Sequence, residues 1–199
     1  MKVYTTCFIG IPLPKKYQQA FETLLVDVSK MCPMLELIDP KTPHITGYYL
    51  DVQSQFNLTD IAKSVESIIG LLKDTKLTVG GFGYFGEDNP RVLFLNVLYP
   101  EVLKDFNQSI TKLLKKYYAN DNDLPFHPHM TIARINTSES KKLLEESNSD
   151  FKARLNEIIW TFPITEVVLY GVDSTKDSEH SEHYEHYEHY EKLITILVR

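Results

Sequence analysis

The chain has 199 residues, of which 43% are hydrophobic and 24% charged, a composition that buries a core and excludes disordered and fibrous classes. Its formal net charge is −6, and the acidic excess lies in residues 177–191, where six carboxylates occur without a Lys or Arg. The balanced remainder argues against a long electrostatic grip on duplex nucleic acid. No apolar stretch approaches the roughly 20 residues of a membrane span, so no membrane partner is expected and the cytoplasm is the default location.

Hydrophobic periodicity predicts alternating strands and helices in the first half of the chain. In chain order these are a strand, a helix, a strand, a helix and two strands, at residues 3–11, 14–31, 44–50, 58–72, 76–79 and 91–98. Turns at 40–43 and 87–90 are marked by Pro, Asp and Asn, and the second joins the last two strands into a hairpin.

The second half repeats much of this pattern. A helix, a strand, a second helix and two final strands are predicted at residues 102–117, 128–135, 138–147, 164–172 and 193–198, with a polar loop at 119–125. Hairpins together with helices favour an α+β fold with antiparallel pairing. We expect one domain over 1–199, built from two similar lobes.

Three other features carry little chemistry. Gly81, Gly83 and Gly86 match the spacing of a dinucleotide fingerprint, but a turn and a strand follow them instead of a helix, so we interpret them as bend or bulge positions. Cys7 lies in a strand-like run and is interpreted as a small buried thiol. Residues 177–190 contain a Glu-His-Tyr repeat, interpreted as a solvated loop that could bind a metal only adventitiously.

Two short motifs remain, one in each half of the chain. Thr42-Pro-His44-Ile-Thr46 and His127-Pro-His129-Met-Thr131 both read Pro-His-apolar-Thr at the start of a predicted strand. Residues two apart in a strand share a face, so each His projects with its Thr while the residue between them faces a core. A single such motif is usually structural, but two matching copies indicate a shared site.

Two imidazoles and two hydroxyls in one groove suit phosphoryl chemistry without a metal. A neutral imidazole can take a proton from attacking water, and an imidazolium can give one to the leaving oxygen. Hydroxyl donors can stabilise charge that grows on the other phosphate oxygens. No third metal ligand is suggested beside His127 and His129, so no metal and no cofactor is expected.

The paired motifs resemble the two-histidine phosphoesterase superfamily, and most closely its LigT-like RNA 2′,3′-cyclic phosphodiesterases, also called 2′-5′ RNA ligases. Residues 125–134 are similar to that branch's second motif, including a trailing Ala-Arg, and residues 8–14, 83–95, 167–174 and 190–193 resemble its other segments. The resemblance covers nearly the whole chain. It implies a bilobal α+β fold with two pseudo-symmetric lobes and antiparallel sheets that flank a central groove.

The resemblance also implies roles for individual residues. His44 would be the general acid and His129 the general base, while Thr46 and Thr131 hold phosphate oxygens. Arg134 would add a charge-assisted contact to the phosphate, although simple alternation puts it on the opposite face, so that this role needs a bulge or a long reach.

This chain departs from the family at Gly47, where members usually carry a bulky apolar residue. Tyr48 would then share the His44 face, where it either stacks a nucleobase or simply packs against the groove wall.

The implied function is metal-independent hydrolysis of a 2′,3′-cyclic phosphate, at an RNA terminus or on a nucleotide, to a 2′-phosphate. Ligation by reversal of this chemistry is secondary. The alternatives are a phosphodiesterase for 2′-5′ oligoadenylates or cyclic dinucleotides, and a nucleotide-binding module without turnover. A monomer that acts on RNA 3′ ends or nucleotides is expected.

Overall fold

The computed structural model describes residues 2–86, 89–117, 125–138, 142, 149–173 and 190–199. Its strands are β1 Val3–Pro12, β2 Glu36–Leu37, β3 His44–Ser54, β4 Lys76–Phe85, β5 Val92–Leu98, β6 His129–Arg134, β7 Ile159–Pro163, β8 Glu166–Asp173 and β9 Glu191–Leu197. Its helices are α1 Lys15–Met31, α2 Gln55–Glu66, α3 Glu101–Leu114 and α5 Ser149–Glu157, with short 3-10 turns at Ile69–Leu72 and Lys115–Tyr117. No helix in this part of the chain is long and apolar enough to cross a membrane.

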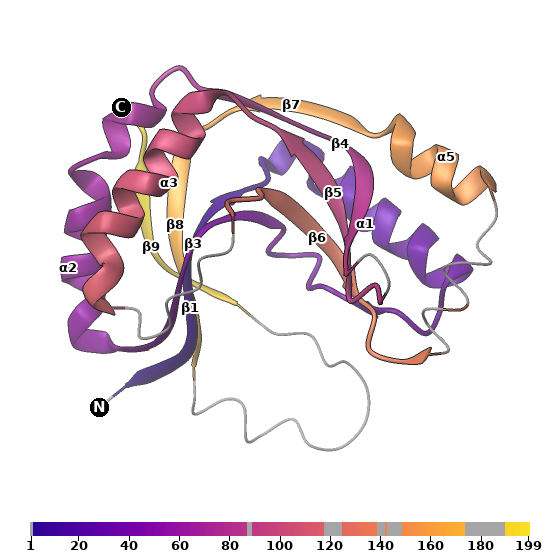
Figure 1. Cartoon of the computed structure of the whole chain (residues 1–199), viewed down its shortest axis with the longest axis horizontal. Coiled ribbons are helices and arrows are strands. Elements are labelled where there is room, and N and C mark those ends of the chain that lie inside the picture. The colour runs from indigo at the N-terminus through magenta and orange to yellow at the C-terminus, as the bar shows by residue number, and fades with distance from the viewer. Residues whose placement is uncertain (1, 87–88, 118–124, 139–141, 143–148, 174–189) are drawn as a thin grey trace.

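All strand pairs are antiparallel and belong to one curled sheet with the order β7-β4-β5-β6-β3-β1-β8-β9, with β2 added beside β6 (Figure 1). The α+β class and the bilobal antiparallel architecture are therefore confirmed. The lobes, however, are not consecutive halves of the chain. One consists of β3, β1, β8 and β9 and the other of β7, β4, β5 and β6, so the chain returns to the first lobe after completing the second.

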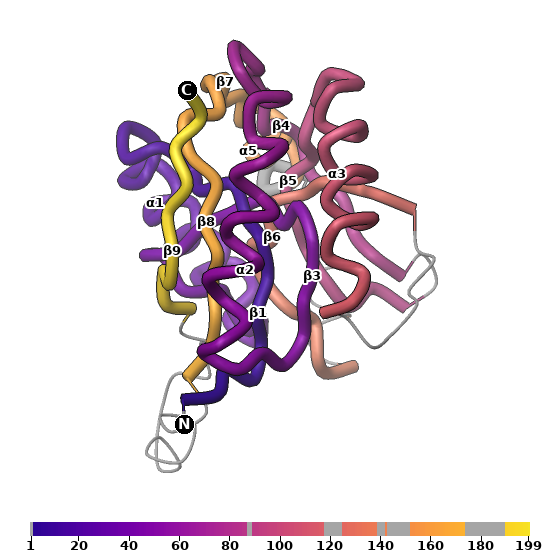
Figure 2. Tube along the Cα trace, turned by 90° about the vertical axis from the view of Figure 1, so that its left-hand side faces the viewer, coloured from indigo at the N-terminus to yellow at the C-terminus, as the bar shows by residue number. Residues whose placement is uncertain are grey.

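Two helices pack on the lobe opposite to the one that contains the strand before them. Helix α1 follows β1, yet its Tyr17 stacks on Trp160 of β7 and donates its hydroxyl to the carbonyl of Thr161 at 2.8 Å. Helix α3 follows β5, yet it packs on β3 and beside α2 (Figures 1 and 2). Each lobe is therefore covered by a helix that connects two strands of the other lobe, and these contacts hold the two lobes together.

Helices α1 and α3 begin directly after a proline and bury one face. Pro100 precedes α3, and its buried positions recur at the three- and four-residue spacing of an amphipathic helix, at Leu103, Phe106, Ile110 and Leu114. The sequence predicts both helices well because burial of such a stripe, at roughly 25 cal/mol per Å2 of apolar area, outweighs local propensity.

The predictions fail where local signals are short. Helix α2 ends at Glu66, and the predicted remainder forms a 3-10 turn; the sequence also misses β2, β7 and α5. Strand β4 continues through the glycines to Phe85, with a register shift between Val79 and Phe82 and Gly81 at φ +66°, so the expected bulge is present. Most of the helix predicted at 138–147 and the loop at 119–125, and part of the turn at 87–90, lie outside the described residues.

Both cysteines are buried thiols, as predicted for Cys7. Cys7 has no solvent exposure and Cys32 only 1%. Burial raises the pKa of the Cys7 thiol to about 12 and also raises the pKa of Cys32, because the thiolate would lose its hydration. Neither thiol is therefore an available nucleophile at neutral pH.

Candidate active site

The two Pro-His motifs fold in the same way at the starts of two strands. His44 is the first residue of β3, and its Nδ1 lies 2.7 Å from the carbonyl oxygen of Thr42. His129 is the first residue of β6, and its Nδ1 lies 2.8 Å from the carbonyl oxygen of His127. A carbonyl only accepts hydrogen bonds, so each Nδ1 carries the proton. The neutral rings consequently leave their Nε2 atoms as acceptors for external chemistry.

The proline inside each motif explains why this geometry occurs twice. Pro43 and Pro128 restrict the residue before them to extended backbone, which presents the carbonyl of that residue to the histidine that follows the proline. Each motif therefore contains a second signal, the order X-Pro-His. This order indicates which ring nitrogen carries the proton as well as where the ring lies.

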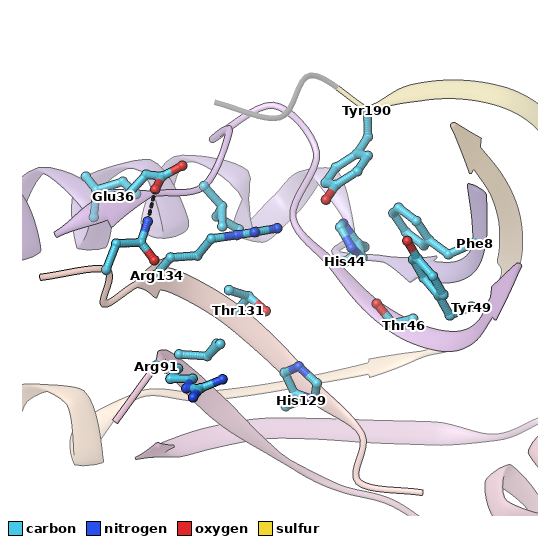
Figure 3. Close-up of a pocket in the computed structure, with 14 residues that line it drawn as sticks. Phe8, Glu36, His44, Thr46, Tyr49, Arg91, His129, Thr131, Arg134 and Tyr190 are labelled. Atoms are coloured by element: carbon cyan, nitrogen blue, oxygen red, sulfur yellow. Dashed lines mark hydrogen bonds between the residues drawn. The ribbon is translucent and has the colours of Figure 1, made fainter. Parts of the chain in front are cut away.

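The apolar residues at the centres of the motifs form the seam between the lobes. Ile45 pairs with Met130 in antiparallel register, and both are buried. Antiparallel pairing at this position brings the His44 end of one motif toward Thr131 and the Thr46 end toward His129. Figure 3 shows the four side chains converging from β3 and β6 on the same space.

A cavity of about 410 Å3 lies over this seam, and both histidines and both threonines line it. The structure therefore brings together the four residues that the two motifs nominate. The sequence could predict this because the strand alternation places each His and Thr on one face and each central residue in the core.

His44 is enclosed by aromatic rings from β1, from β8 and from the residue directly before β9. The ring of Phe8 stacks on it at 4.5 Å between centroids, Tyr170 lies at 5.2 Å, and Tyr190 meets it edge-on at 5.5 Å. Burial lowers the pKa of His44 to about 4; the hydrogen bond to Thr42 opposes this shift, and repulsion from a charged His129 adds to it. His44 is therefore neutral at pH 7.

His129 has a similar but more open setting. Phe85 meets its ring edge-on at 4.6 Å, and Phe94 lies at 5.2 Å. Burial lowers the pKa of His129, with a smaller contribution from neighbouring His127, while the bond to the His127 carbonyl opposes the shift. Both imidazoles are thus uncharged and have a free Nε2 lone pair at neutral pH.

Arg134 lines the same cavity because strand β6 contains the bulge that its role requires. The β5–β6 register shifts by one residue at Ile132, and Ile132 and Ala133 are both fully buried. This extra residue returns Arg134 to the face of Thr131. In Figure 3 the Arg134 side chain extends over Thr131 toward His44.

The prediction that Tyr48 shares the His44 face is wrong. The β1–β3 register shifts between Thr46 and Tyr48, so Gly47 is an extra residue that reverses the alternation. Tyr48 packs against the hydrophobic core, whereas Tyr49 lines the cavity with 42% of its surface exposed. The aromatic residue of the cavity wall is therefore Tyr49, one residue further along the strand.

Other cavity residues escaped the sequence analysis. Arg91, directly before β5, adds a second guanidinium, and at the other end of the cavity the Asn136 side-chain amide donates to a Glu36 carboxylate oxygen (Figure 3). Phe8 and Tyr190 complete the wall beside His44. Tyr190 carried a sequence signal as the last tyrosine of the Glu-His-Tyr repeat, and its place in the cavity wall differs from the solvated loop expected for that segment.

Among the residues that the structure describes, no three His, Cys, Asp or Glu side chains are grouped so that they could hold a metal ion. The cavity wall carries two histidines, two threonines and two arginines, a set of donors and proton carriers that suits recognition of an anionic phosphate.

Known protein sequences resemble this chain over most of its length. The profile of the 2′-5′ RNA ligase superfamily matches residues 35–176. The RNA 2′,3′-cyclic phosphodiesterase of Geobacillus stearothermophilus is 24% identical over 174 residues, which cover 87% of this chain and 54% of that protein. The chain thus spans about half the length of this relative. The enzyme of the same name from Bacillus subtilis (strain 168) is 25% identical over 136 residues, 66% of this chain and 72% of that protein.

Solved structures share the fold. E. coli LigT, in crystal structures with NADP+ and with 3′-AMP, superposes with TM-scores of 0.65 and 0.64 at 17% and 18% sequence identity. In both comparisons 98% of each chain is covered. The two-lobed architecture described above is therefore that of LigT.

Proposed function

This chain belongs to the 2′-5′ RNA ligase superfamily of two-histidine phosphoesterases, and on that premise we propose that it hydrolyses 2′,3′-cyclic phosphates to 2′-phosphates. One observation carries the proposal. His44 and His129 line one cavity with Thr46 and Thr131, and each imidazole has its Nδ1 committed to a backbone carbonyl. This arrangement offers two Nε2 atoms for proton transfer beside two hydroxyl donors.

In the proposed reaction, His129 Nε2 accepts a proton from a water molecule as the water oxygen attacks phosphorus. The bond between phosphorus and the 3′-oxygen breaks, and His44 Nε2 donates its proton to that oxygen. Thr46, Thr131 and Arg134 donate hydrogen bonds to the non-bridging oxygens, which gain charge in the transition state. The product keeps a 2′-phosphate and gains a 3′-hydroxyl, and the proton passes from one histidine to the other overall.

The proton on His44 requires the substrate. Raising the pKa of His44 from about 4 to near 7 needs about 4 kcal/mol, at 1.36 kcal/mol per pH unit. One phosphate charge at about 4 Å supplies about 4 kcal/mol at the effective dielectric of a protein surface. Binding of the phosphate anion can therefore protonate His44, which then donates that proton to the leaving oxygen. The general acid forms mainly when substrate is bound.

The proposed substrate is an RNA 3′ end or a nucleotide, and it fits the charge of the groove. Arg91 and Arg134 are the two guanidiniums on the cavity wall, enough for one or two phosphates and too few for a long duplex. Support comes from two relatives named RNA 2′,3′-cyclic phosphodiesterase and from the LigT structure with 3′-AMP. No cofactor enters the proposed mechanism.

The test is hydrolysis of 2′,3′-cyclic AMP and of a short RNA with a 2′,3′-cyclic end, in the presence of EDTA. The wild-type protein should form only the 2′-phosphate, and His44→Ala and His129→Ala should each lose about 10²–10⁴ in turnover. His127→Ala is the matched control, because the backbone carbonyl that holds His129 remains and the His127 side chain is absent from the cavity wall; it should change only the small contribution of His127 to the pKa of His129 and keep most of the turnover. Loss of activity with EDTA, or nucleotide binding without turnover, would contradict the proposal.

A further inference from the structure

The Glu-His-Tyr repeat ends inside the wall of the active site. Tyr190, its last residue, lines the cavity beside His44 and Phe8. Its ring meets Phe8 at 4.8 Å and His44 at 5.5 Å, edge-on in both cases, while Phe8 and His44 stack on each other at 4.5 Å. The three rings thus form one interlocked group, and Figure 3 shows Tyr190 directed from its place just before β9 toward His44.

The sheet fixes the position of Tyr190. The next residue, Glu191, is the first of β9 and pairs with Gly171 of β8. The Glu191 carboxylate also lies 3.9 Å from the ammonium of Lys2, the residue directly before β1. Whichever residue directly precedes Glu191 is therefore presented at the His44 wall, independently of the length of chain before it.

The repeat makes this position tolerant of length changes. Residues 182–184, 185–187 and 188–190 are identical Glu-His-Tyr units. Loss or gain of whole units leaves a tyrosine before Glu191, whereas a shift by one or two residues puts histidine or glutamate there. The periodicity and the groove contact are separate observations that agree on the same residue.

We propose that the repeat supplies the active site with a tyrosine, and that Tyr190 is a positioning residue that holds the His44 ring against Phe8. The inference rests on the proposed function only for its kinetic readout. The rings that pack on His44 come from β1, β8 and the residue before β9, so removal of Tyr190 leaves one side of the imidazole open. Misplacement of a catalytic group by about 1 Å can cost about a hundredfold in rate.

Paired variants of equal length test this. Deletion of Tyr190 and deletion of Ser181 each shorten the segment by one residue, but only the first replaces the tyrosine before Glu191, with His189. We expect the Tyr190 deletion and Tyr190→Ala to lower kcat about tenfold to a hundredfold with little change in KM. The Ser181 deletion and removal of residues 185–187 should retain wild-type kcat, and Tyr190→Phe, which keeps the ring, should recover most of the kcat that Tyr190→Ala loses.

A second readout does not depend on activity. Within the part of the chain that the structure describes, the titratable or charged groups around His44 are His129 across the cavity, Tyr170 and Tyr190, with the Arg134 guanidinium extending toward it. In an NMR titration, Tyr190→Ala should raise the pKa of His44, since burial is the main cause of its low value, and Tyr190→Phe should not. Equal kcat in the two single deletions, or an unchanged His44 titration in Tyr190→Ala, would overturn the inference. If wild type cleaves no cyclic phosphate, the proposed function fails while the titration still decides the role of Tyr190.

Discussion

Asn107 of α3 donates its side-chain amide to the carbonyl of Gly47 at 2.7 Å, so a helix from the second lobe's connection holds the bulge of the strand that carries His44. Gly47 is buried, and the position of this bulge decides that Thr46 and Tyr49 share the cavity face. Helix α3 is thus linked directly to the geometry of the active site.

Loss of this bond should cost stability. Asn107→Ala leaves the buried Gly47 carbonyl without its donor, and we expect a decrease of about 1–3 kcal/mol in the free energy of unfolding. Chemical denaturation measures this, with Gln108→Ala on the exposed side of the same helix as the control. A decrease no larger than that of the control would show that the bond does not hold the bulge.

Arg134 should contribute to the binding of the phosphate. Arg134→Ala removes a charge-assisted donor and should lower kcat/KM by about tenfold to a hundredfold, or about 1.5–3 kcal/mol. Arg134→Lys should recover part of this loss, because it keeps the charge without the fork of donors. Steady-state kinetics on 2′,3′-cyclic AMP measure both, with Arg154→Ala on α5 as a charge-matched control. Equal kcat/KM in Arg134→Ala and the control would exclude the contact.

Tyr49 is expected to stack the nucleobase in place of Tyr48. Tyr49→Ala should weaken the binding of 2′-AMP by about 1–3 kcal/mol, the usual contribution of one base stacked on an aromatic ring. Tyr48→Phe, which keeps the ring in the core, should leave this affinity unchanged. Calorimetry with 2′-AMP provides the measurement, and wild-type affinity in Tyr49→Ala would remove the stacking role.

The pKa of His44 predicts a specific pH dependence of stability. Its folded pKa, about 4, lies below the value of 6.5 for an exposed imidazole, so the unfolded chain binds the proton more readily. The resulting stability is complete above pH 6.5 and is lost as the pH falls toward 4. Between these limits wild type should lose at most about 3 kcal/mol more than His44→Gln. Denaturation at several pH values measures this difference, and parallel curves for the two proteins would contradict it.

The sequence predicts the catalytic centre better than its surroundings, for a physical reason. The positions of His44, Thr46, His129 and Thr131 follow from strand alternation and from one local motif that occurs twice. Tyr49 and Arg134 depend on bulges at Gly47 and Ile132, and each bulge is set by the register of a neighbouring strand. Such registers arise from pairing between distant segments, which periodicity along one strand does not contain.

The same limit applies to the fold. Helices α1 and α3 are predicted because each buries a continuous stripe, but their exchange between lobes is visible only in contacts such as Tyr17 with Trp160. Strands β2 and β7 are short, with two and five residues, and owe their conformation to pairing with β6 and β4. Local sequence therefore predicts the long elements and misses those that depend on tertiary pairing.

The assignment of acid and base is tested most directly by changing the leaving atom. A 2′,3′-cyclic phosphate with sulfur at the 3′ position releases a thiolate, whose conjugate acid has a pKa of about 8.5. Such a thiolate leaves without a proton donor. His44→Ala should be severely impaired on the oxygen substrate and close to wild type on the sulfur substrate, while His129→Ala should be impaired on both. Rescue of His129→Ala instead would reverse the two roles, and no cleavage of either substrate by wild type would contradict the hydrolytic account as a whole.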